Sequence, residues 1–175
     1  VTTAEAPIKS VTAVKSNVTI NYGESVTLTV NLEYPGDDEG FNFTWYCNDW
    51  YQNSNNITTM KKIYELGPLT PNSTGKKIYR LEFTKDGYSK SCEFVVTVNA
   101  KALTDAMVGT IADQTYDGNA QTPKVTVKDG GKTLVKDTDY TVVYADNTNA
   151  GEATATIKGQ GNYTGQVVKK FTIQP

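Results

Sequence analysis

Apolar and polar residues alternate with a period of two along much of this chain. The clearest examples are 25–32, 41–47 and 92–98, in which every second residue is apolar or aromatic. Successive side chains of a strand point to opposite faces, so this alternation predicts strands that bury one face. No stretch has a helical period, and Thr, Val and Tyr are abundant, which favours strands. The pattern therefore predicts an all-β protein.

The predicted strands are separated by turns rich in Gly, Pro, Asn and Asp. We expect strands at 8–14, 17–20, 25–32, 41–47, 61–66, 76–84, 89–98, 101–104, 124–128, 140–144, 152–158 and 166–173. Residues 48–59 are polar and rich in Asn and are predicted to form a loop, and Lys85-Asp86-Gly87 is typical of a hairpin turn. A chain of 175 residues with this strand spacing favours two domains, predicted at residues 1–100 and 101–175.

The strand at 41–47 places Phe43, Trp45 and Cys47 on one apolar face, which predicts a core position for Trp45. A strand with an inward Trp resembles the third strand of an immunoglobulin sandwich. The Tyr-x-Cys motif and the second-strand Cys of antibody domains are both missing, so their disulfide cannot form here. We expect residues 1–100 to form an immunoglobulin-like β-sandwich without that bridge.

The second half contains a series of short motifs in a fixed order. They are Tyr116-Asp117-Gly118, Pro123, Asp129-Gly130-Gly131, Asp139-Tyr140, Tyr144, Asn147, Ala150-Gly151 and Gly159-Gln160-Gly161-Asn162-Tyr163. The series, which covers about residues 111–173, resembles the bacterial cell-surface repeats of the YDG and MBG type. Those repeats are immunoglobulin-like β modules strung along secreted or wall-attached proteins. The resemblance implies a second sandwich that serves as a spacer or stalk, and it carries over no catalytic residue.

Cys47 and Cys92 are the two cysteines, and both fall on the apolar faces of their predicted strands. They can be two buried free thiols, which pack as small hydrophobic groups, or they can form one disulfide. The resemblance to surface repeats implies an oxidising compartment, which favours the disulfide. The last strand of the first half also resembles the end of hyalin-repeat and related modules, in which such a bridge occurs. A strict immunoglobulin order places another strand between the two cysteines, whereas bridged Cα atoms lie about 4.4–6.8 Å apart.

Charge and residue types narrow the range of functions. The net charge is −2 and neither half is biased, so a nucleic-acid partner is not indicated. The chain has no His, no nucleophile elbow and no phosphate-binding loop, so we predict no enzyme, no cofactor and no metal. The acidic Asp37-Asp38-Glu39 lacks the spacing of a calcium loop and is predicted to be a solvated turn. No apolar stretch approaches the roughly 18 residues of a membrane helix, so membrane insertion is not expected.

Trp50 and Tyr51 are the candidate ligand-binding residues, because they lie in the predicted polar loop without an evident core partner. Flat exposed rings stack on sugars or anchor protein contacts; alternatively, Trp50 folds back over the end of the sandwich. We expect a non-catalytic structural segment of a secreted or cell-wall-attached bacterial surface protein, monomeric within a longer multidomain chain. The alternative function is an adhesion or carbohydrate-binding module that contacts a glycan or a host protein through these two residues.

Overall fold

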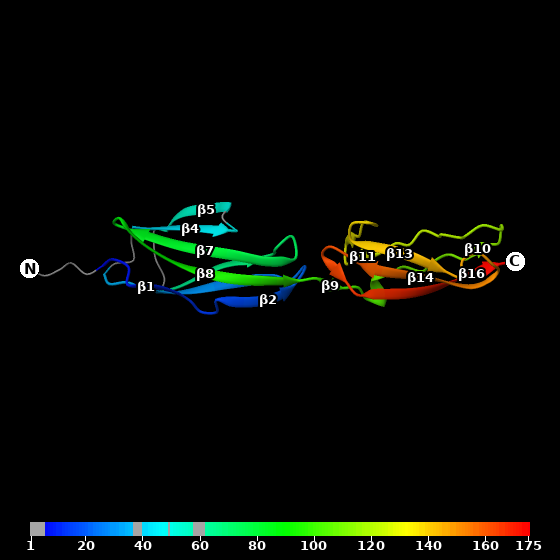
Figure 1. Cartoon of the computed structure of the whole chain (residues 1–175). Coiled ribbons are helices and arrows are strands. Elements are labelled where there is room, and N and C mark those ends of the chain that lie inside the picture. The colour runs from blue at the N-terminus through cyan, green and yellow to red at the C-terminus, as the bar shows by residue number, and fades with distance from the viewer. Residues whose placement is uncertain (1–5, 37–39, 49, 58–61) are drawn as a thin grey trace, which may run out of the picture. The chain divides into compact units, whose positions relative to one another are not determined.

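The computed structural model describes residues 6–36, 40–48, 50–57 and 62–175, with 50–57 described by its backbone alone. The chain divides into two compact units, Val1–Asn99 (unit 1) and Ala100–Pro175 (unit 2). Both units are built of strands, as the alternation predicts, and the strands and the connections of each unit can be followed in Figure 1.

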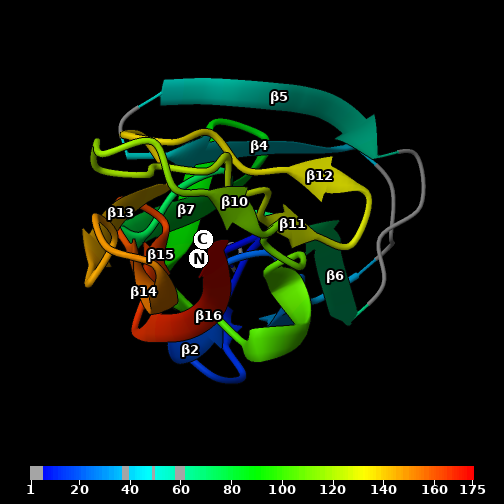
Figure 2. The ribbon, with the colours of Figure 1, turned by 90° about the vertical axis from the view of Figure 1, so that its right-hand side faces the viewer.

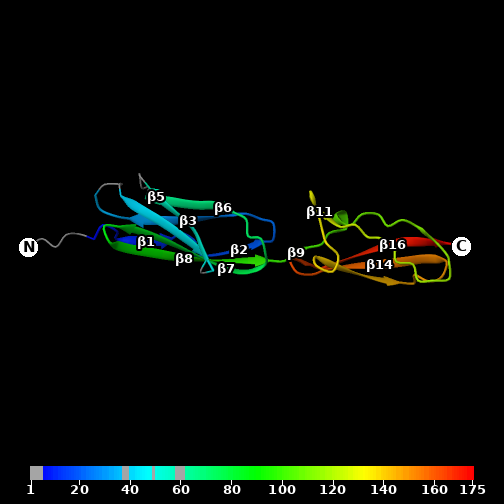
Figure 3. The same cartoon turned by 90° about the horizontal axis from the view of Figure 1, so that it is seen from above.

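Unit 1 consists of two antiparallel-rich sheets. Its strands are β1 (Ser10–Ala13), β2 (Asn17–Asn21), β3 (Val26–Glu33), β4 (Phe41–Cys47), β5 (Trp50–Ile57), β6 (Ile63–Leu69), β7 (Gly75–Lys85) and β8 (Tyr88–Asn99). The larger sheet has the order β2-β8-β7-β4-β5, and the smaller has the order β1-β3-β6. Figure 3 shows the smaller sheet, with β3 beside β6. β1, β3 and β6 take the places of strands A, B and E of an immunoglobulin sandwich, and β4, β7 and β8 those of C, F and G.

The core of unit 1 lies between the apolar faces of the two sheets. Its largest fully buried side chains include Phe41, Phe43, Phe83 and Phe94. Phe43 packs on Phe83 with ring centroids 4.9 Å apart, which is a distance typical of favourable aromatic pairs. Trp45 is half-buried and packs against this core, so its predicted inward phase is confirmed although it is not fully enclosed.

The hairpin predicted at Lys85-Asp86-Gly87 joins β7 to β8. Lys85 pairs with Tyr88, and both intervening residues have positive φ values, 50° at Asp86 and 80° at Gly87. Two consecutive positive φ values define the two-residue turn whose twist matches that of the flanking strands. Asp and Gly tolerate this conformation, so the local sequence determines where the two longest strands of the protein reverse.

The predicted loop at 48–59 is wrong over most of its length, because residues 50–57 form β5. This strand pairs with β4 at the edge of the larger sheet, from Phe41 opposite Ile57 to Cys47 opposite Trp50. Figure 2 shows β5 alongside β4. The segment WYQNSNNI has no apolar alternation, because an edge strand held by backbone pairing needs no buried side-chain row. The side-chain pattern alone therefore could not reveal it.

The disulfide expected between Cys47 and Cys92 is not present; both cysteines are free and half-buried. β7 lies between their strands, with Cys47 opposite Tyr79 and Cys92 opposite Leu81. Two strand spacings amount to about 9.5 Å, which exceeds the separation of bridged Cα atoms. Leu81 also lies two residues after Tyr79, where the antibody Tyr-x-Cys motif has its cysteine, so an apolar side chain fills the centre of this sandwich.

Unit 2 has one regular sheet and a second layer with little regular pairing. Its elements are β9 (Lys101–Ala102), the 3-10 helix η1 (Asp105–Met107), β10 (Gln114–Thr115), β11 (Lys128–Asp129), β12 (Lys132–Thr133), β13 (Tyr140–Ala145), β14 (Gly151–Gly159), β15 (Tyr163–Thr164) and β16 (Gln166–Gln174). The sheet has the order β10-β16-β14-β13, β9 pairs with β15, and β11 pairs with β12. Together the sheet and the opposing layer make a second immunoglobulin-like sandwich.

The core of unit 2 follows the predicted alternation. Ala153, Ala155 and Ile157 of β14 have no exposed surface. Ala155 lies opposite Tyr144, and Ile157 lies opposite Val142, so β13 and β14 share one inward face. The small alanines leave room for the opposing layer to approach closely.

The layer opposite this sheet is held largely by side chains that bond to the backbone. The predicted strand at 124–128 is extended, but only its last residue belongs to a strand, β11. The Tyr140 hydroxyl donates to the carbonyl of Val125 at 3.0 Å, and the Tyr144 hydroxyl donates to that of Pro123. The buried Asp139 carboxylate accepts a hydrogen bond from the backbone N–H of Val135 at 2.9 Å. These bonds satisfy backbone groups that a neighbouring strand would otherwise pair.

Candidate functional site

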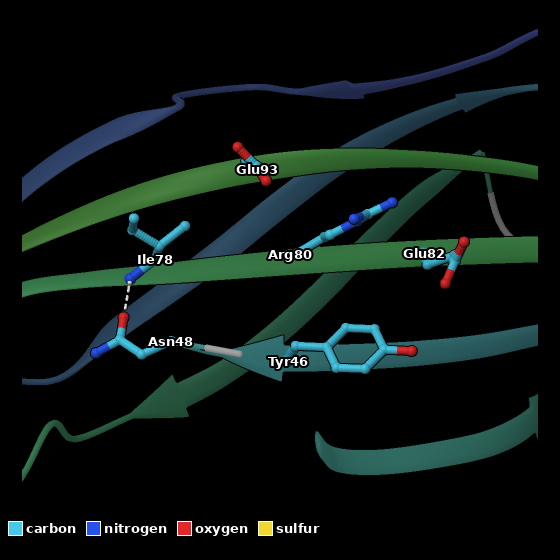
Figure 4. Close-up of a pocket in the computed structure, with 6 residues that line it drawn as sticks. All are labelled: Tyr46, Asn48, Ile78, Arg80, Glu82 and Glu93. Atoms are coloured by element: carbon cyan, nitrogen blue, oxygen red, sulfur yellow. Dashed lines mark hydrogen bonds between the residues drawn. The ribbon is translucent and has the colours of Figure 1, made fainter. Parts of the chain in front are cut away.

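A shallow hollow lies on the outer face of the larger sheet of unit 1, over β4, β7 and β8. Its volume is about 410 Å³. The six residues that line it, shown in Figure 4, are Tyr46, Asn48, Ile78, Arg80, Glu82 and Glu93. They occupy the polar phase of the same strands whose apolar phase forms the core.

Strand register brings three of these residues into one row. Arg80 of β7 pairs with Tyr46 of β4 on one side and with Glu93 of β8 on the other. Directly opposed residues of neighbouring strands have Cβ atoms about 4.5–5.5 Å apart, so the phenol, the guanidinium and the carboxylate are neighbours on one surface. Sequence reasoning passed over this row, although the outward phase of β4, β7 and β8 contained the signal.

Asn48 forms one end of the hollow through its backbone conformation. It has a φ of 48°, and its Oδ1 accepts a hydrogen bond from the N–H of Ile78 at 2.7 Å. The N–H of Asn48 in turn donates to the carbonyl of Ile78 at 2.8 Å. The side-chain amide thus continues the pairing of β4 with β7 beyond Cys47, a role that Asn fills because it tolerates left-handed backbone angles. Ile78 remains 45% exposed beside it.

The charges of the hollow are not neutralised within it. Among the described residues, no carboxylate lies within 4 Å of the Arg80 guanidinium. Glu82 accepts a hydrogen bond from the Ser89 hydroxyl at 2.5 Å. A guanidinium with five N–H donors, two carboxylates and an amide beside a phenol ring offers many hydrogen bonds to a polar ligand.

The backbone of the predicted residues Trp50 and Tyr51 lies next to this hollow. In the register of β4 with β5, Tyr51 is opposite Tyr46, and Trp50 is opposite Cys47. Their side chains lie outside the described part of the chain, so their contact with a ligand stays a prediction. The backbone register brings the predicted site and the observed hollow to the same end of the larger sheet.

Three groups in the core of unit 1 have raised pKa values. Burial, with a smaller contribution from Glu93, raises the pKa of the Cys92 thiol from 9.0 to about 11. Burial and the neighbouring Cys47 raise the pKa of Tyr79, and burial raises that of Tyr64. The Cys92 thiol is therefore protonated at neutral pH and is a poor nucleophile, because the thiolate is the reactive form.

Nothing in the described residues indicates a metal site or a membrane-spanning helix. There, no group of three or more Cys, Asp or Glu side chains is placed to hold a metal ion. The acidic Asp37-Asp38-Glu39 lies outside the described residues, so its predicted role as a solvated turn is untested. In the part of the chain that the structure describes, no helix has the length and hydrophobicity needed to cross a bilayer.

No protein-family model matches the sequence, and no curated protein matches it significantly. Several solved structures have a similar fold. Extracellular domains 3–5 of Drosophila OTK align with 98% of this chain and 67% of their own, at 13% identity and a TM-score of 0.45. A titin fragment, A168169, aligns with 95% of this chain and 98% of its own, at 15% identity and a TM-score of 0.48. The fibronectin(III)-like modules of Clostridium thermocellum CbhA align with 94% of both chains, at 12% identity and a TM-score of 0.36.

These similarities concern the fold alone. The assignment of two immunoglobulin-like sandwiches rests on the strand order and register described above.

Proposed function

We propose that this chain is a non-catalytic structural segment of a longer bacterial surface protein, secreted or attached to the cell wall, in which each unit is a spacer. The observation that carries the proposal is the path of the chain. Within each unit, considered by itself, the chain enters at one end of the sandwich and leaves at the other. A module connected in this way adds its full length to a stalk.

In unit 1 the path follows from the pairing of the first and last strands. Ser10 lies opposite Glu33 at the end of β3. Asn21 lies opposite Asn99, the last residue of β8, and a short turn leads from Asn21 to the start of β3 at Val26. Entry and exit are therefore separated by the length of β3, which has eight residues and spans about 27 Å.

In unit 2 the same relation holds through β16. Lys101 lies opposite Tyr163, which precedes the start of β16 at Gln166. The chain leaves at Gln174, the end of β16. A strand of nine residues spans about 30 Å, so this unit also carries the chain from one end to the other. The ordered motifs of residues 111–173, with their resemblance to YDG- and MBG-type repeats, support the same function and the bacterial surface location.

Pulling the two termini apart by single-molecule force spectroscopy tests the proposal. In both units the last strand pairs in parallel with a strand from earlier in the chain, β8 with β2 over five residue pairs and β16 with β10 over two. A force along the strands then shears several hydrogen bonds together instead of opening them one by one. We expect two separate force peaks, one for each unit. Extension of either unit without a force peak would argue against a spacer that bears tension.

A second function, adhesion to a glycan or a host protein, is favoured by one observation, the row of Tyr46, Arg80 and Glu93 beside the backbone of Trp50 and Tyr51. The test compares the intact chain with an Arg80→Ala variant and with a Trp50→Ala, Tyr51→Ala variant on glycan and matrix-protein arrays. Tyr88→Ala is the matched control, because Tyr88 is an exposed aromatic residue of the same unit outside the hollow. Binding that is lost in the first two variants and retained in the control supports adhesion. If the chain binds nothing, or if the variants bind as the parent does, adhesion through this site is contradicted and the spacer function is the one that remains.

A further inference from the structure

Strand β13 of unit 2 has a backbone partner on one side only. It is the last strand of the order β10-β16-β14-β13. The carbonyl of Asp139 accepts a hydrogen bond from Gln160 on the β14 side, whereas the carbonyl of Tyr140 accepts one from Asp137 on the opposite side. Because backbone groups of successive strand residues alternate in direction, Val142 and Tyr144 point their N–H and C=O groups away from β14.

These four backbone groups are open along a short stretch of the edge. Among the described residues, no backbone hydrogen bond is formed by Val142 or Tyr144 on that side. The stretch is closed at one end by the bond from Asp137 to Tyr140, and at the other by the 2.6 Å bond from the N–H of Gln121 to the carbonyl of Asn147. An exposed row of this kind is a template for an added strand.

A groove runs beside this edge. Its volume is about 490 Å³, and it is lined by Thr122, Pro123, Lys124, Val125, Lys136, Tyr140, Val142 and Tyr144. One wall is β13, and the other is the extended segment 122–125. The hydroxyls of Tyr140 and Tyr144 reach across to the carbonyls of that segment, so the two walls are held together. An added strand would direct every second side chain into this groove.

The groove carries positive charge. Lys124 and Lys136 are exposed at its margin, and neither forms an ion pair among the described residues. None of the residues that line the groove is acidic. The side chains that enter it would therefore be favoured as carboxylates.

The opposite face of the sheet indicates what the alternate side chains should be. Val143 is 66% exposed and Val168 is 51% exposed. Both pair with Thr156 of the central strand, so the three residues form one row across β13, β14 and β16. A strand added to β13 would extend this row, and a β-branched side chain would pack on Val143.

We propose that the open edge of β13 binds an extended acidic peptide segment of a partner protein, which adds a fifth strand to the sheet. The segment alternates carboxylate side chains, which face Lys124 and Lys136, with β-branched side chains, which pack on Val143. Its backbone pairs with Val142 and Tyr144, as in other complexes formed by strand addition. This interaction goes beyond the spacer function, since it makes unit 2 a docking site along the stalk.

Nuclear magnetic resonance of the full chain, titrated with a synthetic peptide of alternating glutamate and valine, tests the proposal. We expect the N–H groups of Val142 and Tyr144 to shift and to become protected from hydrogen exchange. The same peptide with alternate backbone amides methylated should not bind, because it cannot donate to the edge. A lysine–valine peptide should not bind either.

Charge reversal on the protein provides the matched comparison. Lys124→Glu combined with Lys136→Glu should weaken binding about tenfold, since exposed ion pairs contribute modestly. Lys158→Glu alters an exposed lysine of the neighbouring strand outside the groove and should change binding by less than about twofold. If the reversal unfolds unit 2, Lys124→Gln with Lys136→Gln replaces it.

Three results would overturn the proposal. One is binding by the methylated peptide, and another is a shift pattern centred away from β13. The third is protection of the Val142 and Tyr144 amides that rises with protein concentration in the absence of peptide, which would assign this edge to a second copy of the chain.

Discussion

Unit 1 and unit 2 share a fold class but stabilise it by different means. In unit 1 both layers are regular sheets, and the core between them is built from large aromatic side chains. In unit 2 one layer is a sheet, and much of the other is an extended chain attached by the hydroxyls of Tyr140 and Tyr144. The comparison teaches that backbone pairing and side-chain hydrogen bonds can substitute for each other within one architecture. The stability of unit 1 should depend chiefly on the volume of its buried aromatic side chains. The stability of unit 2 should depend on the close approach of its backbone segments and on individual tyrosine hydroxyls.

The largest expected effect is the loss of an aromatic core residue in unit 1. Phe83 has no exposed surface and contacts Phe43 and Tyr64. Phe83→Ala should cost about 3–5 kcal/mol, the usual penalty for emptying such a position. Denaturant unfolding of the full chain should show the unit 1 transition shifted and the unit 2 transition unchanged. Trp45→Ala should cost less, because Trp45 is only half-buried. An equal loss would show that the exposure of these two side chains does not determine how much each contributes to stability.

The next largest effect concerns the close approach of the β14 and β15 backbones in unit 2. A Cβ atom added at Gly159 would lie 2.6 Å from the backbone nitrogen of Thr164, and a backbone atom cannot move aside as a flexible side chain can. Gly159→Ala should therefore destabilise unit 2 by about 1–3 kcal/mol, as overpacking does. Gly131→Ala is the matched control, because nothing lies within 4 Å of its added Cβ. Equal stability of the two variants in thermal unfolding would contradict the tight β14–β15 contact.

Removing a tyrosine hydroxyl from unit 2 should lower its stability by a smaller amount. Tyr140→Phe keeps the ring but leaves the Val125 carbonyl, which is buried in this unit, without its donor. We expect a loss of about 1–3 kcal/mol from unit 2. Tyr79→Phe in unit 1 is the comparison, because the strands within each sheet of that unit pair through their backbones and the Tyr79 hydroxyl bonds Cys47 of its own sheet. A similar loss of stability in both units would show that unit 2 does not depend more than unit 1 on single tyrosine hydroxyls.

The smallest effect is a difference in alkaline stability. Burial in unit 1 raises the pKa of Cys92 from its ordinary value of 9.0 to about 11. The folded state therefore retains its proton where the unfolded state loses it, so the stability of unit 1 should fall as pH rises from about 9 to about 11. In unit 2, burial raises the pKa values of Tyr140 and Tyr144 above 10.0, so its loss should begin about one pH unit higher. Thermal unfolding across this pH range measures the loss of stability in each unit. Cys92→Val should remove the loss in unit 1 that begins near pH 9. If that loss persists in the variant, Cys92 is not its cause.

Much of the fold could be predicted because its signals are local. The alternation of β3 and β4 is visible in the sequence, and so is the turn at Asp86 and Gly87. The apolar phases of β4 and β8 also placed Cys47 and Cys92 on the core-facing sides of their strands. The side-chain period and the turn chemistry act over a few residues, and the sequence contains them directly.

The outward phase of each strand is visible in the sequence, but which outward residues become neighbours is not. Tyr46 and Arg80 belong to different strands, and only the pairing of β4 with β7 makes them neighbours. β5 was missed because a polar edge strand takes its stability from the adjacent backbone and not from its own side chains.

The sequence by itself determined an all-β chain, the alternating faces, the hairpin of unit 1 and the ordered turns of unit 2. The tertiary structure alone decided the lateral order of strands. That order separates Cys47 from Cys92 by β7, gathers the row of Tyr46, Arg80 and Glu93, and leaves β13 with an open edge. The physical reason is that a strand's period is a property of its own residues, whereas its neighbours are chosen by the packing of the whole sandwich.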